Sequence, residues 1–575
     1  MQLVRRLRLP AVVCSLAVLV CELLSRPYAA MGIADDGPYS LVARSLATTG
    51  HIRYNGWSAA MLGWHLYLGA AFIKLFGFSF TTVRMSTLLV SVLTAFLLQR
   101  TLVRAGVTER NATIGTLALV LSPLYLMLSV TYMTDISGLF AVVLCLYGCL
   151  RALQPPTDRA TIAWLCFAVF TNAVLGTSRQ IAWLGVLVMV PSALYLLRFR
   201  RRVLLVGDLL TAAGALCILA CLIWLSRQPY TLPEHLPPKT FPVGDLLMVL
   251  PYTLADLPYL LLPITVLFFP EIRCLRSRTL AAAALFLAGY IFLATYPSHL
   301  RGDFQLFPLP SSLSLGEWNN VIGMFAYALL KGQPPIVIGK FAQVLLTVAT
   351  FGAMLGLAAS SRPSSRGSLA AKTAISWRQL GVLLLPFFLA YLLLLIPRAA
   401  TYGLRDRYLL ELLVVVLLFV LRYYQDRVHP QLPAVTVPLV AVVAVYSLVM
   451  THNMFSLYRA RVAIANELVA AGVPDTEVDN GWEYNFVVQI RHAGYINESH
   501  IELPAHAYVP PPPLPAGTCP FNSSGQTPSI RPLYGISFDP NACYGPAPFA
   551  PVHYSRWPYR TPGALYVVRY LPPRT

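Results

Sequence analysis

Long apolar segments follow one another through most of the chain and are separated by short polar gaps. As a helix, each segment is long enough to cross a hydrocarbon core of about 30 Å with some tilt. With 57% hydrophobic and only 12% charged residues, the 575-residue chain has more apolar surface than a water-soluble protein can bury. We therefore predict an all-α polytopic membrane protein with about thirteen transmembrane helices. The expected spans are residues 10–28, 83–98, 113–130, 136–150, 161–176, 181–197, 204–224, 247–269, 279–296, 335–360, 379–397, 408–424 and 433–451.

The polar gaps alternate between basic and acidic, and this alternation predicts the orientation of the spans. Arg5, Arg6 and Arg8 precede the first span, and clusters such as residues 198–202 recur in every second gap. Basic gaps are typical of the cytoplasmic side. We therefore expect a multi-pass protein of the cell (inner or plasma) membrane with a cytoplasmic N-terminus and an extracytoplasmic C-terminal domain. The net charge of +19 is assigned to these topology signals and not to nucleic-acid binding.

The first apolar segment has two interpretations. It resembles a secretory signal that is cleaved after Ala29 and Ala30, because small residues follow the apolar run. It is also longer than a usual signal core, which favours an uncleaved first span. We prefer the span.

The composition changes near His452, where charges, turn residues and prolines become frequent. This change predicts a transmembrane domain over residues 1–451 and a small mixed α/β soluble domain over residues 452–575. The proline run at residues 510–513 is expected to be a stiff internal spacer. Cys519 and Cys543 lie in this polar tail and are expected to form a disulfide if the compartment is oxidising.

Three carboxylates fall at the outer ends of predicted spans. Asp35 and Asp36 follow the first span, and Asp135 follows the third. A carboxylate at a partly desolvated membrane mouth suits general-base work on an acceptor hydroxyl or amine. The alternative is that these residues cap helices, because each precedes a helical run.

Several cationic side chains are expected on the same face. Arg179 stands between two apolar runs, and Arg405 and Arg407 stand at the outer end of a later span. Guanidinium groups at that depth suit a lipid phosphate, which they can grip with two parallel hydrogen bonds. The alternative is snorkelling or pairing with Asp406. In the outer loop at residues 296–320, His299 and Arg301 are weaker candidates for a phosphate or metal contact.

These residues resemble the GT-C membrane glycosyltransferases, in the branch of protein O-mannosyltransferases and lipid A aminoarabinose transferases. That family carries an acidic pair in its first outer loop, an Asp in the second, and an Arg-Tyr-Leu-Leu element that opens a late span. Here Asp35-Asp36, Asp135 and Arg407-Tyr408-Leu409-Leu410 match. The resemblance implies that Asp35 is the catalytic base, that Asp36 and Asp135 support the acceptor or a divalent ion, and that Tyr408 belongs to the substrate site. Because the family usually has Glu where Asp36 stands, the base is left open between Asp35 and Asp36.

The predicted function is an inverting glycosyltransferase that takes a sugar from a polyprenyl-phosphate donor. The acceptor is expected to be an extracytoplasmic glycolipid, polysaccharide or protein, and membrane lipids are the other partners. A divalent cation is the one cofactor considered, with Asp36 and Asp135 as its candidate ligands. A transporter or flippase is the main alternative, but its charged residues would lie at the bilayer midplane and not at span ends. A third alternative is an assembly scaffold whose tail binds a partner.

Overall fold

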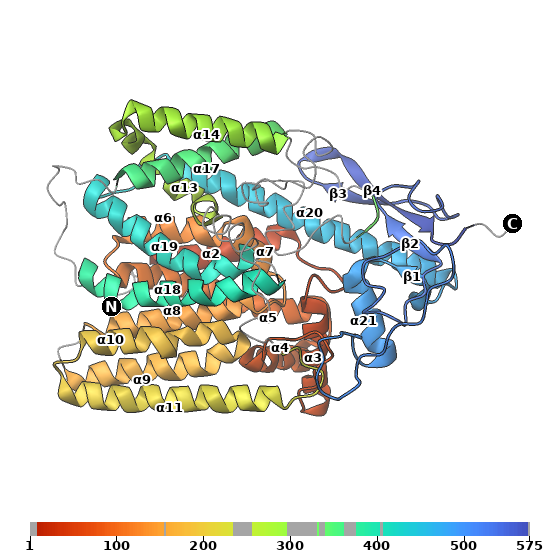
Figure 1. The fold of residues 1–575 in the computed structure, drawn as a ribbon, viewed down its shortest axis with the longest axis horizontal. Coiled ribbons are helices and arrows are strands. Elements are labelled where there is room, and N and C mark those ends of the chain that lie inside the picture. Colours follow the sequence, from red (N-terminus) through yellow and green to blue (C-terminus); the bar gives the residue numbers. More distant parts are fainter. Residues whose placement is uncertain are drawn as a thin grey trace.

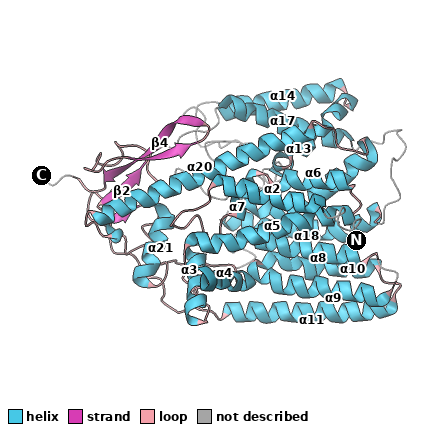
Figure 2. Ribbon diagram, turned by 180° about the vertical axis from the view of Figure 1, so that it is seen from behind, coloured by secondary structure: helices cyan, strands magenta, loops and turns pink. Residues whose placement is uncertain are grey.

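A computed structural model describes residues 9–154, 157–233, 256–295, 330–332, 340–360, 375–402 and 406–572. The long helices run roughly side by side, and the strands gather with helix α21 (Gly481–Ala493) at one end of this bundle (Figures 1 and 2). The expected fold class is confirmed: the protein is a multi-pass helical membrane protein with a small sheet near its C-terminus.

Within the described residues, seven helices are long and apolar enough to cross a membrane, or eight if one bent pair counts as a single span. The predicted total of about thirteen stays a prediction. The shorter apolar helices include α2 (Leu9–Ser25), which packs against α5 and α20. The seven are α5 (Phe80–Arg104), α8 (Asp135–Ala152), α9 with the short helix η1 (Asp158–Ser178), α11 (Arg201–Ser226), the first part of α18 (Trp377–Pro397), the run from η7 through α19 to η8 (Asp406–Val428) and α20 (Thr436–Ala470).

The bent pair corresponds to the span predicted at residues 113–130. Helix α6 (Glu109–Val120) ends there, α7 (Pro123–Ser129) begins, and the two axes differ by 68°. Pro123 lacks the amide hydrogen that would continue the helix, and the Ser122 hydroxyl accepts a hydrogen bond from the Tyr125 amide to start the next one. The sequence therefore breaks this span at the serine–proline step.

The remaining described helices include several short or irregular ones. Helix α18 continues to Tyr402, beyond the apolar part of its span. The others are η2 (Gln180–Trp183), η3 (Gly185–Met189), α10 (Val190–Leu196), α13 (Leu262–Thr265), η4 (Val266–Cys274), α14 (Ser277–Thr295), α17 (Lys340–Ser360) and η9 (Asp475–Glu477).

Burial separates the centre of the bundle from its lipid-facing rim. The most apolar window is 83% buried in the span of residues 406–428 and 78% buried in α8, but only 11% buried in α11. The central position of α8 and α19 (Leu410–Tyr423) brings residues 135 and 407–411 together. Helix α11 presents its apolar side chains outward, as lipid contact requires.

Two short helices, α3 (Asp36–Thr49) and α4 (Gly63–Phe76), lie in the sequence between the first two predicted spans. Each has 14 residues, too few to cross the membrane. Gly50 ends α3 in the left-handed conformation, with φ 76°. The start of α3 places Asp35 and Asp36 beside the ends of the central spans.

The tail contains a four-stranded sheet with strand order β1-β2-β4-β3. β1 runs parallel to β2, and the other two pairs are antiparallel. Cys519 and Cys543 form the predicted disulfide. The proline run at residues 510–513 lies outside helices and strands. The strands are β1 (Val478–Asp479), β2 (Tyr534–Ser537), β3 (Val552–Arg556) and β4 (Tyr559–Arg569).

Helix α20 passes without a break through the predicted domain boundary at residues 451 and 452. Its 35 residues extend about 52 Å at 1.5 Å per residue, well beyond a hydrocarbon core of about 30 Å. Its first half therefore suits a span, and its second half projects beyond the membrane into the tail.

The disulfide generates a prediction for the tail. Replacing Cys519 or Cys543 by Ser should lower the stability of the tail by about 3 kcal/mol, because the bridge closes a loop between residues 24 apart in sequence. The double replacement should cost no more than either single one. Thermal unfolding of the purified protein in detergent, with Cys166→Ser as the control at an exposed free thiol, measures this. Equal melting temperatures in all four variants would contradict it.

Candidate active site

Asp35, Asp135 and Arg407 meet where α3, α8 and α19 begin. The Arg407 Nη2 atom lies 2.9 Å from Asp35 Oδ2, and its Nη1 atom lies 3.7 Å from Asp135 Oδ2. One guanidinium group thus bridges two carboxylates that are 100 residues apart in sequence. The Arg407 and Asp35 side chains are 14% and 16% exposed, whereas Asp135 is buried.

Asp35 occupies the N-cap position of α3 but does not cap the helix with its side chain. Its Oδ1 atom instead accepts a hydrogen bond of 2.9 Å from the indole nitrogen of Trp57, and its Oδ2 atom accepts one from Arg407. The two bonds hold both oxygens of the carboxylate. The structure therefore does not use this carboxylate as a helix cap.

Asp36 has a different environment. It is fully buried and forms an ion pair with Arg84, with Oδ2 at 2.7 Å from Nε and Oδ1 at 3.1 Å from Nη2. Its oxygens also accept hydrogen bonds from the amides of Ile33 and Tyr132. Arg84 in turn donates to the carbonyls of residues 29 and 31. This pair joins the start of α3 to α5 and to the loop before α8.

Arg179 extends the cluster on the other side of Asp135. It lies between η1 and η2, pairs with Asp135 Oδ1, and has its Nε atom 3.7 Å from Glu411 Oε1. The guanidinium carbons of Arg179 and Arg407 each lie 5.3 Å from the ring centroid of Tyr408. Both cations thus lie within cation–π distance of one aromatic ring, an arrangement that the ring's negative face stabilises.

Glu411 and Tyr391 are members of this cluster that the sequence reasoning missed. Glu411 is fully buried, and its Oε2 atom accepts a hydrogen bond of 2.8 Å from the Tyr391 hydroxyl. The same hydroxyl lies 2.9 Å from the carbonyl oxygen of Tyr408. A single acid inside an apolar run indicates a functional or paired group, and Glu411 is such an acid in the run at residues 408–424.

Tyr39 and His65 are two further titratable side chains near the cluster, because Tyr39 feels the charge of Asp35 and His65 that of Asp135. Burial, followed by the charge of Asp35, holds the pKa of the Tyr39 hydroxyl well above its usual range. Burial lowers the pKa of His65 to about 4. His65 is fully buried, with its Nδ1 atom 3.0 Å from the Ser137 hydroxyl. Both groups are therefore neutral near pH 7.

Asp36 and Asp135 do not fit the role of joint cation ligands. Donors of Arg84 and two amides occupy the oxygens of Asp36, and the oxygens of Asp135 face Arg179 and Arg407. Among the residues with described positions, no group of three or more His, Cys, Asp or Glu side chains is arranged to hold a metal ion. The remaining predicted site residues, Arg405, His299 and Arg301, lie outside the described residues.

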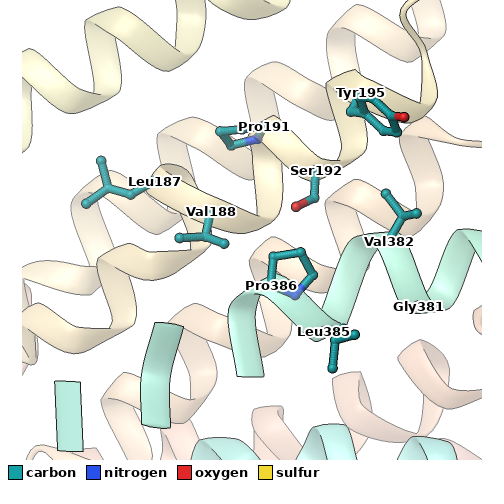
Figure 3. Close-up of a pocket in the computed structure, with 9 residues that line it drawn as sticks. All are labelled: Leu187, Val188, Pro191, Ser192, Tyr195, Gly381, Val382, Leu385 and Pro386. Carbon is teal, nitrogen blue, oxygen red and sulfur yellow. The ribbon is translucent and has the colours of Figure 1, made fainter. Parts of the chain in front are cut away.

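An apolar groove lies between α18 and the segment formed by η3 and α10 (Figure 3). Pro386 on its α18 side is five residues before Tyr391, which corresponds to about 7.5 Å along the helix axis. Leu187 and Leu385 at the groove are about half exposed. Its lining residues are Leu187, Val188, Pro191, Ser192, Tyr195, Gly381, Val382, Leu385 and Pro386.

Residues 63–225 match the family model described as dolichyl-phosphate-mannose-protein mannosyltransferase. This match confirms the resemblance to the GT-C glycosyltransferases over a part of the chain that contains Asp135 and Arg179. A search of curated proteins finds no match.

Three solved structures share low similarity with the chain. ArnT from Cupriavidus metallidurans in the apo state is 17% identical, with 82% of this chain and 83% of that chain covered and a TM-score of 0.39. The same protein bound to undecaprenyl phosphate is 16% identical, with 80% of this chain and 80% of that chain covered and a TM-score of 0.38. The apo oligosaccharyltransferase of Archaeoglobus fulgidus is 14% identical, with 80% of this chain and 58% of that chain covered and a TM-score of 0.34.

The buried pair generates a stability prediction. Asp36→Asn should destabilise the protein by about 3–5 kcal/mol, because it leaves the buried Arg84 charge without its carboxylate. Asp35→Asn is the matched control. The Asp35 side chain is partly exposed, so its replacement should cost far less stability. Melting temperatures in detergent compare the two. A loss in Asp36→Asn no larger than in Asp35→Asn would contradict a structural role for Asp36.

Proposed function

We propose that the protein is an inverting glycosyltransferase that moves a sugar from a polyprenyl-phosphate donor to an extracytoplasmic acceptor. The observation that carries the proposal is the Asp35 carboxylate, partly exposed at the mouth of the spans and held between Trp57 and Arg407. The partial match to a family of lipid-phosphate-dependent mannosyltransferases supports it.

In this proposal Asp35 is the catalytic base. One carboxylate oxygen takes the proton from the acceptor hydroxyl or amine as that nucleophile attacks the anomeric carbon. The attack comes from the face opposite the phosphate, so the bond from the anomeric carbon to the phosphate oxygen breaks and the configuration inverts. The bonding electrons leave with the polyprenyl phosphate. A positioned base contributes roughly 10²–10⁴-fold to such a step.

Asp36 is assigned a positioning role in place of the base. Its two oxygens are occupied by Arg84 and by backbone amides, and it is fully buried. It fixes the start of α3 and so fixes the backbone that carries Asp35. Asp135 is proposed to position both arginines, because it lies between Arg179 and Arg407.

Arg407 and Arg179 are proposed to hold the donor phosphate, with the Tyr408 ring in contact with both guanidinium groups. Fixed guanidinium groups stabilise the charge that develops on the leaving lipid phosphate. A bound phosphate would replace part of the contact that Arg407 makes with Asp35, leaving that carboxylate better able to accept a proton. The apolar groove along α18 is suited to hydrocarbon and is proposed to take part of the lipid chain (Figure 3).

The charges of the polar gaps support an orientation of the chain in the membrane. The N-terminus is placed in the cytoplasm and the tail outside the cell or inner membrane, as the basic gaps predict. Asp135 is the first residue of its span and Arg407 the second residue of its own. This depth suits a donor whose tail stays in the bilayer while its sugar reaches the extracytoplasmic edge.

The proposed base generates a direct prediction. A strain that lacks the protein should accumulate a polyprenyl-phosphate sugar, which mass spectrometry of extracted lipids detects. The wild-type gene should clear this lipid, and Asp35→Asn should not, because the amide cannot take the proton.

Asp475→Asn is the control for that experiment, because it removes an acid on the tail surface. Membrane insertion is checked by immunoblotting. If Asp35→Asn clears the lipid as well as the wild type does, the catalytic assignment of Asp35 is wrong.

The proposed phosphate contact predicts the kinetics of an Arg407 variant. Arg407→Lys keeps the charge but loses the planar fork, so kcat/KM for the lipid-linked donor should fall by about 10- to 100-fold. Arg560→Lys, at an exposed position in the tail, should leave kinetics unchanged. Wild-type kinetics in Arg407→Lys would return this residue to a purely structural ion pair.

A further inference from the structure

We propose that helix α21 of the tail is a positioning element of the active site. In this inference Trp482 and Phe486 hold the indole of Trp57, and Trp57 orients the Asp35 carboxylate. The inference rests on the proposed role of Asp35 as the base, and it extends the site to a part of the chain near the C-terminus. α21 lies beside α3 in both views of the fold (Figures 1 and 2).

The contact between the tail and Trp57 is aromatic. The ring centroids of Trp57 and Phe486 are 4.6 Å apart, those of Trp57 and Trp482 are 5.9 Å apart, and those of Trp482 and Phe486 are 5.1 Å apart. Tilted rings at these separations attract one another beyond simple area burial. Phe486 is almost fully buried, so it packs as a fixed support for the indole.

The Trp57 indole connects this aromatic cluster to the site. Its Nε1–H donates a 2.9 Å hydrogen bond to Asp35 Oδ1. The other oxygen of Asp35 accepts from Arg407. Trp57 and Arg407 together therefore fix the carboxylate plane, and a displaced indole would leave the carboxylate fixed from the Arg407 side alone.

The backbone around Trp57 is also tied to the tail. The amide of Ile496 donates to the carbonyl of Asn55 at 2.8 Å. Gly56 has φ 83°, and a Cβ there would lie 2.5 Å from the Ile496 carbonyl oxygen, so only glycine allows this approach. The amide of Gly56 donates to the carbonyl of Tyr230, whose own amide donates to the carbonyl of Leu503.

α21 is itself firmly placed. Glu483 on α21 pairs with Arg461 on α20 at 3.1 Å, and both side chains are fully buried. A Cβ on Gly37, the residue after Asp36, would lie 3.2 Å from Val487 Cγ2, so α21 packs closely against the start of α3. The path from α20 through α21 and Trp57 to Asp35 thus consists of direct contacts.

The test begins with Trp57→Phe, which keeps an aromatic ring and removes the N–H group. kcat should fall by about 10- to 100-fold, since a hydrogen bond to a charged group is lost. The KM for the lipid-linked donor should change little, because Arg407 is untouched. The acid limb of the pH–rate profile should move to higher pH, because the lost bond favoured the charged carboxylate.

Phe486→Ala tests the contribution of the tail. It should reproduce the fall in kcat and the shift of the pH profile. Phe486→Tyr keeps an aromatic ring in the same space, so it should retain the wild-type kcat and pH profile. Val488→Ala is the matched control, because Val488 lies on the same helix but packs into the separate core around Phe521 and Tyr570. Val488→Ala should leave the pH profile in place.

Asp35→Asn, assayed in parallel, distinguishes a failure of the proposed base from a failure of the proposed role of α21. Full activity in Asp35→Asn overturns the proposed function and this inference with it. Inactive Asp35→Asn together with wild-type kcat and pH profile in Trp57→Phe overturns the inference alone. An unshifted pH profile in Phe486→Ala also overturns it, even if the variant is less stable.

Discussion

The ion pair between Arg407 and Asp35 joins residues 372 positions apart and is the contact around which the site is organised. A charge near the membrane is costly unless it is paired, so each charged residue of the cluster requires another. Arg407 faces Asp35 and Asp135, and Arg179 faces Asp135 and Glu411. Three carboxylates and two guanidinium groups thus hold the ends of α3, α8 and α19 at one point. The same requirement explains the Asp36–Arg84 pair, which fixes the backbone next to Asp35.

The sequence was sufficient to predict the general architecture, because hydropathy and the placement of basic residues act locally. It also singled out Asp35, Asp135, Arg179 and Arg407, which the structure brings together. It was not sufficient to distinguish Asp35 from Asp36. That distinction depends on Arg84, which stands at the start of an apolar segment and offers no local sign of its partner. Trp57 likewise resembles an ordinary interfacial tryptophan, and its contact with Asp35 depends on how the chain folds back.

The break in the span at residues 113–130 was visible in the sequence as Ser122 followed by Pro123, but hydropathy alone does not register it. The continuity of α20 could not be predicted from composition. Its composition changes near residue 452 while its backbone does not. The composition of a helix follows its surroundings. A helix that extends from the membrane into water therefore changes in composition without ending.

The contact between Trp57 and α21 also has a consequence for how the protein is made. Residues 35–57 leave the ribosome early, whereas Trp482 and Phe486 leave it after more than four hundred further residues. The N-terminal spans of a growing chain fold before its later parts exist. The indole beside Asp35 gains its support only when α21 has been synthesised and packs beside α3. A chain whose synthesis stops before α21 therefore carries Asp35 without the aromatic support of Trp57.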